Sequence, residues 1–422
     1  MEDRYGLRIG TDSMEAASLY SQGLERSQTQ QSGAVDLLTE SVAIDPEFAV
    51  AHSALGIARR TDGDIAGGAQ SIAKSAELLG RLGEREQSHI TLTNKIVHGE
   101  IRSFVAMAKD HLSRWPLDSQ ILQLTLANLN IGIGLPNRDE EMLALVTQVA
   151  SHYEHDWFHT AAHAFALEET RRFGEAQSLG EQALELKPNN SRAAHVLAHT
   201  YLETGRGLEG EMFLRGWLDR WEHPGGFTCH LTWHRALFAL AQGDPTSARE
   251  LLRDVMGWMG RSIAVLTDGS SLAWRLHLDG VEDDLPWDVL GALPDRIGFG
   301  FGNAHRAIVL AGLADTDALK AYSATLDEAA VREPTMSSVA LWTRGLEAFV
   351  SGNMKLAAER FDALLPSVRD LCGSHAQTEV FVDTHIAALE RCGRNVDAAE
   401  MLRTRLSSRD SIRDQVWLAR VS

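Results

Sequence analysis

The feature that most constrains this chain is a 34-residue unit at residues 157–190. Its small, aromatic and proline positions are occupied by Ala164, Phe173, Ala176, Ala183 and Pro188. These offsets are typical of a tetratricopeptide repeat, in which small residues let two helices approach closely. The proline ends the second helix because it has no N–H to donate. The unit therefore predicts a helix-turn-helix pair.

The same pattern recurs along most of the sequence. Matching units begin near residues 14, 51, 84, 118, 191 and 229, and further pairs follow at 303–331, 338–366 and 379–407. No segment alternates polar and apolar residues over a length that would suggest a sheet. We therefore predict an all-α fold of about ten tetratricopeptide-type helix-turn-helix repeats, which form a right-handed superhelical solenoid.

The repeat pattern weakens after residue 260, where prolines interrupt the helical periodicity. We predict N-terminal helix pairs in residues 1–260, an irregular helical connection in 261–302 and C-terminal helix pairs in 303–422. No low-complexity linker separates them, so all three segments are expected to belong to one continuous superhelix. The winding of residues 260–300 is left open.

Charge limits the classes of partner. The chain carries 58 acidic and 40 basic residues, for a net charge of −18. Nucleic acids and anionic membranes both require a cationic surface, so neither is expected as a partner. The opening residues MEDRYGLRIGTDS contain no apolar run, and no apolar stretch reaches the length of a membrane span. With three cysteines in no metal-binding spacing, we expect a cytoplasmic protein.

Several segments are longer than a repeat consensus demands. They include REQSHI (85–90), AFALEETRRFGEAQ (164–177), AAHVLAHTYLETGRGLEG (193–210), HLTWHRALF (230–238) and GSHAQTEVFVDTHIAAL (373–389). Through these segments the sequence resembles the tetratricopeptide repeat protein 38 family over nearly its whole length. The resemblance implies a helical repeat fold and a pattern of histidines, but no defined reaction.

Histidines are unusually paired. The chain has 17 of them, and random placement would give about 0.7 pairs at a spacing of four. Four such pairs occur: His155/His159, His159/His163, His195/His199 and His230/His234. Residues four apart share one helix face, which is the spacing by which a single helix offers two imidazoles to a metal.

Repeat register indicates which side chains face the inside of the superhelix. Counted from the start of each unit, His89, His195, His199, His230, Trp233 and Asp383 fall at concave-groove positions. Imidazoles and a carboxylate can serve as general acid and base. The candidate catalytic residues are therefore His195, His199, His230 and Asp383. The alternative is that these groups hydrogen-bond within a narrow interior and have only a structural role.

Two further sets complete the candidate site. Glu203 follows His199 by four residues, so His195, His199 and Glu203 form a candidate metal site for a divalent metal such as zinc or iron. Aromatic walls, an arginine that can bind a carboxylate and additional imidazoles form a candidate ligand-binding set. Its members are His89, Trp233, His234, Arg275, His305, Trp342 and His375.

Two functions remain open. The first is a solenoid that binds a small molecule, with or without a metal, in a histidine- and aromatic-lined cavity, and that catalyses acid–base chemistry on it. The second is a scaffold that takes a protein or peptide in its groove. Peptide-binding grooves use lysine, arginine and asparagine, whereas this groove carries histidine and aromatics, which favours the first. Whether the chain is an enzyme is not decided by these patterns.

Overall fold

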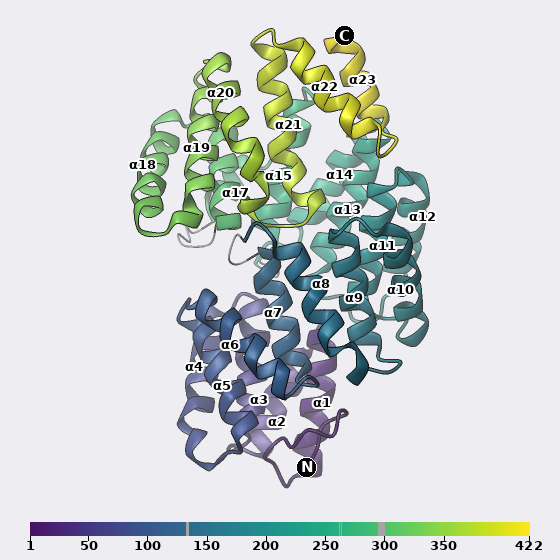
Figure 1. The fold of residues 1–422 in the computed structure, drawn as a ribbon, viewed down its shortest axis with the longest axis vertical. Coiled ribbons are helices and arrows are strands. Elements are labelled where there is room, and N and C mark those ends of the chain that lie inside the picture. Colours follow the sequence, from purple (N-terminus) through teal and green to yellow (C-terminus); the bar gives the residue numbers. More distant parts are fainter. Residues whose placement is uncertain (132–134, 261, 263, 294–299) are drawn as a thin grey trace.

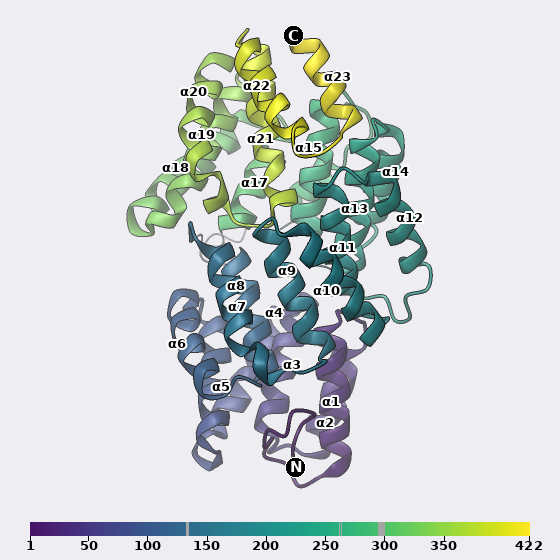
Figure 2. The same cartoon turned by 45° about the vertical axis from the view of Figure 1, so that its right-hand side comes forward.

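The computed structural model describes residues 1–131, 135–260, 262, 264–293 and 300–422. These ranges contain 23 α-helices and no β-strand beyond two isolated bridges. The prediction of an all-α, tetratricopeptide-type solenoid is confirmed. Figures 1 and 2 show the first helix pairs at one end of the molecule, the last pairs at the other, and α9–α14 between them.

The helices alternate as first and second members of successive pairs. The N-terminal ones are α1 Met14–Gln28, α2 Ala34–Ile44, α3 Ala49–Thr61, α4 Ile65–Glu77, α5 Glu84–Val97, α6 Ile101–Arg114, α7 Ser119–Ile131 and α8 Arg138–Val149. The central ones are α9 Trp157–Glu169, α10 Phe173–Leu186, α11 Ser191–Glu203, α12 Gly207–Leu218, α13 Thr228–Ala241 and α14 Pro245–Met256.

The C-terminal part continues the series. Its helices are α15 Ser270–Leu278, α16 Trp287–Gly291, α17 Gly300–Gly312, α18 Thr316–Arg332, α19 Ser337–Val350, α20 Met354–Leu364, α21 His375–Arg391, α22 Asn395–Leu406 and α23 Ile412–Val421. Short 3₁₀ helices are η1 Leu79–Arg81, η2 Ala150–His152, η4 Pro334–Met336 and η5 Leu365–Leu371, and a π-helix, η3, spans Val265–Gly269.

The unit at residues 157–190 folds as the helix pair α9 and α10. Ala164, Ala176 and Ala183 are fully buried, so the small side chains do lie where the two helices touch or pack on the next pair. Asp156 begins α9 by accepting a hydrogen bond from the backbone N–H of His159. Asn190 begins α11 in the same way, because a side-chain oxygen satisfies N–H groups that have no partner in the first turn.

The solenoid winds tightly enough for the first repeat to contact the central repeats. The Ser191 hydroxyl, at the start of α11, donates to the carbonyl of Thr29 at 2.7 Å. The Arg192 Nε donates to the carbonyl of Gln28 at 2.9 Å. The end of α1 therefore lies against the beginning of α11, and the two ends of these helices are fixed relative to one another.

The C-terminal repeats return to the middle of the chain. The N–H of Gly373, just before α21, donates to the carbonyl of Asn130 in α7 at 3.2 Å. Arg369 forms ion pairs with Asp139 at 2.7 Å and with Glu169, the last residue of α9, at 2.9 Å. These contacts bring the start of α21 beside the end of α9, as Figure 1 also shows.

The predicted connection at 261–302 is more regular than the sequence suggests. The π-helix η3 runs directly into α15, and Trp274 and Arg275 of α15 are buried. The Trp274 indole donates to Thr384 at 2.9 Å and Arg275 donates to the carbonyl of Ala376 at 2.9 Å, both in α21. Residues 261, 263 and 294–299 of this segment lie outside the described residues. The division into three segments stays a prediction.

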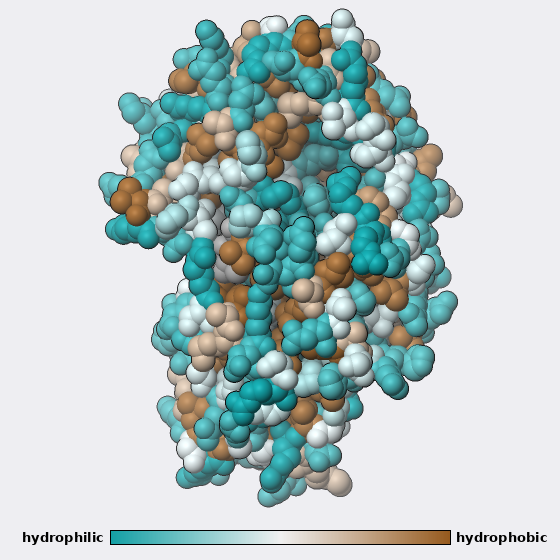
Figure 3. Space-filling model, viewed as in Figure 1, coloured by the Kyte–Doolittle hydropathy of each residue, from teal (hydrophilic) through white to brown (hydrophobic). Residues whose placement is uncertain are grey.

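The surface is mainly polar on the face seen in Figure 3, with apolar side chains in scattered groups. Among the helices described, none combines the length and the hydropathy that a membrane span requires.

Candidate metal centre

Four histidines meet in the interior between α11 and α13. His195 and His199 lie on one face of α11, and His230 and His234 lie on one face of α13. One ring nitrogen from each of the four lies within 4.8 Å of every other. The two spacings of four residues therefore place two imidazole pairs opposite each other, because α11 and α13 are the neighbouring first helices of consecutive repeats.

The ring nitrogens are in close contact. The Nε2 atom of His195 lies 2.8 Å from Nε2 of His199 and 2.9 Å from Nε2 of His230. The His234 ring packs on the rings of His199 and His230, with centroid separations of 4.6 Å and 4.8 Å. His199 and His234 are fully buried, His230 is nearly so, and His195 is half-buried.

Aromatic rings hold the imidazoles in place. Phe165 of α9 stacks on His195 at an interplanar angle of 24°, and Phe227 meets the same ring edge-on. Trp233 stacks on His230 at 15°, and its indole N–H donates to the Ser271 hydroxyl at 3.0 Å. The imidazoles therefore lie in an apolar frame, and that frame fixes the direction in which they present nitrogen.

Asp268 sets the tautomer of His230. The Nδ1–H of His230 donates to Asp268 Oδ2 at 2.9 Å, and Asp268 is almost completely buried. Asp268 projects from the π-helix η3, a type of helix that often occurs at functional sites. With its proton on Nδ1, a neutral His230 presents a lone pair at Nε2, which is the arrangement of a histidine that ligates a metal.

The ring nitrogens of the cluster cannot all be paired by hydrogen bonds. If Nε2 of His195 carries a proton, that proton can be donated along only one of its two short contacts. If it carries none, its single lone pair can accept along only one of them. Both nitrogens of His234 are buried without a hydrogen-bond partner among the described residues. Buried polar groups are normally paired, so this set of nitrogens is a candidate ligand set for a metal ion.

Burial keeps three of the four imidazoles neutral. It lowers the pKa of His195, His199 and His234 well below the ordinary value, and the neighbouring imidazoles lower it further. Desolvation disfavours a charged imidazolium, and two adjacent positive charges repel each other. These three rings are therefore neutral near pH 7, which is the form that binds a metal ion.

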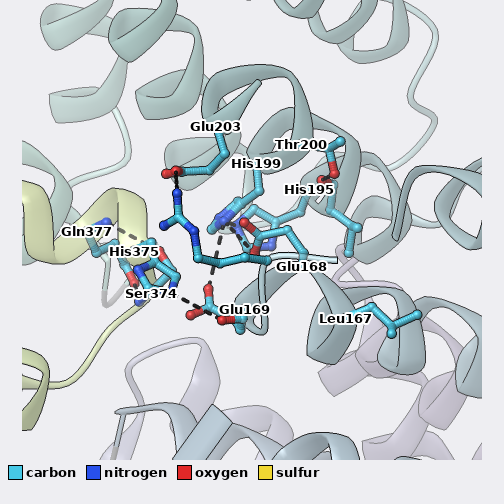
Figure 4. Close-up of polar contacts among 12 residues, drawn as sticks. Leu167, Glu168, Glu169, His195, His199, Thr200, Glu203, Ser374, His375 and Gln377 are labelled. Carbon is cyan, nitrogen blue, oxygen red and sulfur yellow. Dashed lines mark hydrogen bonds and ion pairs between the residues drawn. The ribbon is translucent and has the colours of Figure 1, made fainter. Parts of the chain in front are cut away.

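Two carboxylates at the end of α9 lie on the other side of His199. Its Nδ1 is 3.2 Å from Glu168 Oε2 and 3.9 Å from Glu169 Oε1, and Figure 4 shows these three side chains pointing toward one another. Burial raises the pKa of Glu168 well above its usual range, and the neighbouring Glu169 raises it further. Burial also raises the pKa of Glu169, against the opposing charge of Arg369.

Glu203 has a different environment from the one predicted. Its carboxylate lies 3.4 Å from the Arg409 guanidinium and 3.9 Å from that of Arg171. It is not a member of the group that contains the four imidazoles. The structure therefore groups His195 and His199 with His230 and His234 and not with Glu203, and Glu203 as a metal ligand stays a prediction.

Asp383 forms ion pairs with arginines and does not contact the imidazole cluster. It lies in the interior, as its register predicted, but three guanidinium groups surround it: Arg405 and Arg413 at 2.8 Å each and Arg275 at 3.7 Å. A carboxylate held in this way does not accept a substrate proton readily, because neighbouring positive charges stabilise its ionised form. Asp383 and Arg275 belong to one buried ion-pair network, and a catalytic role of Asp383 stays a prediction.

The remaining predicted ligand-binding residues make contacts within the protein. His89 Nδ1 lies 2.9 Å from Asp118 Oδ2. The His305 ring donates to the carbonyl of Phe301 and the Trp342 indole to that of Ala304. His375 Nε2 lies 3.1 Å from the carbonyl of Glu169, beside the two carboxylates of α9. Of the predicted ligand-binding set, His234 joins the imidazole cluster and Trp233 borders it.

A hollow of about 550 Å³ lies at the N-terminal end of the molecule, away from the imidazole cluster. Its lining includes Arg8, Glu47, Arg81, Arg85 and Trp115, and no histidine. The imidazole cluster is instead packed side chain against side chain. A histidine-lined cavity therefore stays a prediction.

No protein-family model matches the chain. Among solved structures, the chain is similar to a human IFIT1 dimer with m7Gppp-AAAA, with 14% identity, a TM-score of 0.42, and 98% of this chain and 87% of that one covered. It is also similar to the APC/C hetero-tetramer Cut9–Hcn1, with 14% identity, a TM-score of 0.36, and 97% and 96% covered. Neither function is transferred at these values. The resemblance to the tetratricopeptide repeat protein 38 family stays a prediction.

Proposed function

We propose that this chain is a metal-binding helical repeat protein, whose centre holds one divalent transition metal between His195, His199, His230 and His234. The observation that carries the proposal is the convergence of four imidazole nitrogens, three of them on buried residues, within 4.8 Å of one another. No assignment of protons satisfies both short nitrogen–nitrogen contacts at His195, whereas a shared cation satisfies all four nitrogens at once.

Ligand type favours zinc over iron. Four imidazoles suit zinc, copper, nickel or iron, but non-haem iron commonly takes a carboxylate among its ligands. A tetrahedral zinc site has metal–nitrogen distances of about 2.0–2.1 Å, which places its ligand atoms about 3.4 Å apart. The observed separations of 2.8 and 2.9 Å are shorter. These two pairs of nitrogens must therefore move apart by about 0.5 Å to fit a tetrahedron, and the remaining pairs lie within 4.8 Å of one another.

We also propose His195 as the ligand that exchanges for a small molecule. It is the one member of the four that is only half-buried. Asp268 does not hold it, and its ring rests between Phe165 and Phe227. Displacement of one ligand opens a coordination position, which a zinc centre needs for acid–base chemistry on a bound molecule. The nature of the partner, including the expectation that it is not nucleic acid, and the cytoplasmic location stay predictions.

The alternative, a groove that takes a peptide, finds less support. The two tryptophans expected to line a groove are fully buried, and their indole N–H groups donate to Ser271 and to the carbonyl of Ala304. Such side chains stabilise the interior and do not present a binding surface.

Elemental analysis of protein purified without a metal-affinity tag tests the proposal. We expect close to one zinc per chain in the unaltered protein and none in the His195→Ala/His199→Ala double variant. His159→Ala is the matched control, since this buried histidine contacts the carbonyl of Val146 at 2.8 Å and lies outside the cluster. Absence of metal from the unaltered protein after incubation with zinc, or equal metal in the double variant, would overturn the proposal.

A further inference from the structure

The side of His199 that faces away from the other imidazoles meets buried carboxylates. A nitrogen of His199 and one oxygen each from Glu168 and Glu169 lie within 4.8 Å of one another. All three side chains are at most 1% exposed. Figure 4 shows them converging beside α11, with the start of α21 approaching from the other side.

These groups lack the hydrogen bonds that buried polar groups require. With both carboxyls ionised, neither oxygen of Glu168 has a hydrogen-bond partner among the described residues, and the same holds for Glu169 Oε1 and His199 Nδ1. A protonated Glu168 can hydrogen-bond to Glu169. The 3.2 Å contact between His199 Nδ1 and Glu168 is within ion-pair range but does not have hydrogen-bond geometry. An unpaired buried carboxylate is strongly unfavourable, so a cation between these groups would remove a large desolvation penalty.

The neighbouring cation does not fill this position. Arg369 contacts Glu169 through Oε2, at 2.9 Å, and Asp139 at 2.7 Å. Asp139, Glu169 and His375 form another potential ligand group, but Arg369 already lies against two of its members. Glu169 Oε1 and both oxygens of Glu168 are left free on the side of His199. The position that lacks positive charge is therefore the one between Glu168, Glu169 and His199.

We propose that Glu168, Glu169 and Nδ1 of His199 bind a second divalent cation, and that the His199 ring bridges it to the first. This inference rests on the proposed function, since His199 Nε2 belongs to the four-histidine centre. Two oxygens and one nitrogen form a ligand set for zinc or manganese. When the second cation binds, Glu168 and Nδ1 of His199 each release a proton to solvent, so Glu168 binds as a carboxylate and the imidazole becomes an imidazolate ligated at both nitrogens.

Metal stoichiometry after zinc loading and dialysis separates the two proposals. We expect two zinc ions per chain in the unaltered protein, one in Glu168→Gln and none in His195→Ala/His199→Ala. Glu168→Gln keeps the size and shape of the side chain and introduces no charge, so it is expected to fold. Glu211→Gln is the control, because Glu211 pairs with Arg235 on α13 at 2.6 Å, and it should retain two ions.

A single zinc in both the unaltered protein and Glu168→Gln would overturn the second site and leave the four-histidine centre standing. Two ions in Glu168→Gln, or none, would also overturn it, because the second ion would then lie elsewhere or Glu168 would serve only the first centre. No zinc in the unaltered protein would overturn both proposals.

Copper loading tests the bridge itself. Two Cu²⁺ ions joined by one imidazolate are spin-coupled, so the integrated electron paramagnetic resonance signal at low temperature should fall well below two spins per chain. In Glu168→Gln it should return to one full spin. A signal of two independent spins in the unaltered protein would contradict the bridge.

Discussion

The Nε2 atoms of His195 and His199 lie 2.8 Å apart, one helical turn from each other on α11. The contact recurs across the helix interface, where Nε2 of His230 lies 2.9 Å from that of His195. Neutral imidazoles have one N–H each, so contacts of this kind need a donor and an acceptor at every pair. Here the Nδ1–H of His230 donates to Asp268 and not to another imidazole. A metal ion is a partner that one ring nitrogen from each of the four histidines can share.

Asp268 should strengthen metal binding without being a ligand. Asp268→Asn is expected to weaken zinc affinity about 10- to 100-fold, because an amide orients the His230 ring less well and does not increase its basicity. Competition with a chromogenic chelator measures this change. Glu211→Gln, which alters an ion pair on α13 outside the cluster, should leave the affinity unchanged. Equal effects from both variants would argue against a specific role of Asp268.

Asp383 should prove structural. Replacement by asparagine removes the charge that neutralises Arg405 and Arg413, so Asp383→Asn is expected to lower the free energy of unfolding by about 3–5 kcal/mol. Denaturant unfolding measures it. Asp362→Asn is the comparison: that carboxylate pairs with Arg394 and His385 but is 40% exposed, and its loss should cost less than about 1 kcal/mol. Loss of metal with unchanged stability in Asp383→Asn would contradict this assignment.

The same network predicts acid sensitivity. Burial alone would raise the pKa of Glu379, but Arg409 and Arg405 outweigh it and lower that pKa to about 2. Burial likewise opposes Arg413 and Arg405 at Asp383, whose pKa they hold well below its usual range. Groups with a lowered folded-state pKa stabilise above their unfolded value, so this contribution is complete above roughly pH 4 and is lost as the pH falls toward 2.

Unfolding free energies measured between pH 3 and 7 check this expectation. The difference in free energy of unfolding between the unaltered protein and Asp383→Asn should be constant near pH 7. It should become smaller as the pH falls below about 4. A difference that grows in acid would mean that the Asp383 carboxylate is destabilising when ionised.

Close packing between repeats can be tested with two glycines of α12. A methyl group on Gly210 would come within 2.5 Å of the Phe238 ring and 2.8 Å of Tyr201. Gly210→Ala is therefore expected to cost about 1–3 kcal/mol of stability. On Gly216 the same methyl meets nothing within 4 Å, so Gly216→Ala should stabilise the helix by up to about 1 kcal/mol. Thermal melts of both variants measure the difference, and equal shifts would contradict the packing described.

The sequence predicted the parts of this molecule that obey a local period. Small residues such as Ala164 and Ala176 mark helix contacts because repeat spacing is a short-range property. His195, His199 and His230 were placed in the interior by the same register. Glu168 occupies the twelfth position of the 157–190 unit, which is a groove position, so the register also contained the signal for this missed residue.

Other parts depend on contacts between distant segments. Asp268 reaches His230 from a π-helix, which follows no tetratricopeptide register. Asp383 was correctly predicted to face inward, but its partners Arg405 and Arg413 come from the end of the chain and meet it only through the winding of the last repeats. Glu203 lies on the same face of α11 as His195 and His199, but it forms an ion pair with Arg409. Periodicity predicts on which face of a helix a side chain lies. It does not predict which side chain from a distant segment contacts it.

The most direct test of the account is X-ray absorption at the zinc edge on protein loaded with one equivalent of zinc. The four-histidine centre predicts a first shell of four nitrogen atoms at about 2.0 Å, with the outer-shell scattering of imidazole rings. In His234→Ala one of these ring contributions should disappear. A shell of six oxygen atoms, or a spectrum that is the same in both proteins, would contradict a metal held by His195, His199, His230 and His234.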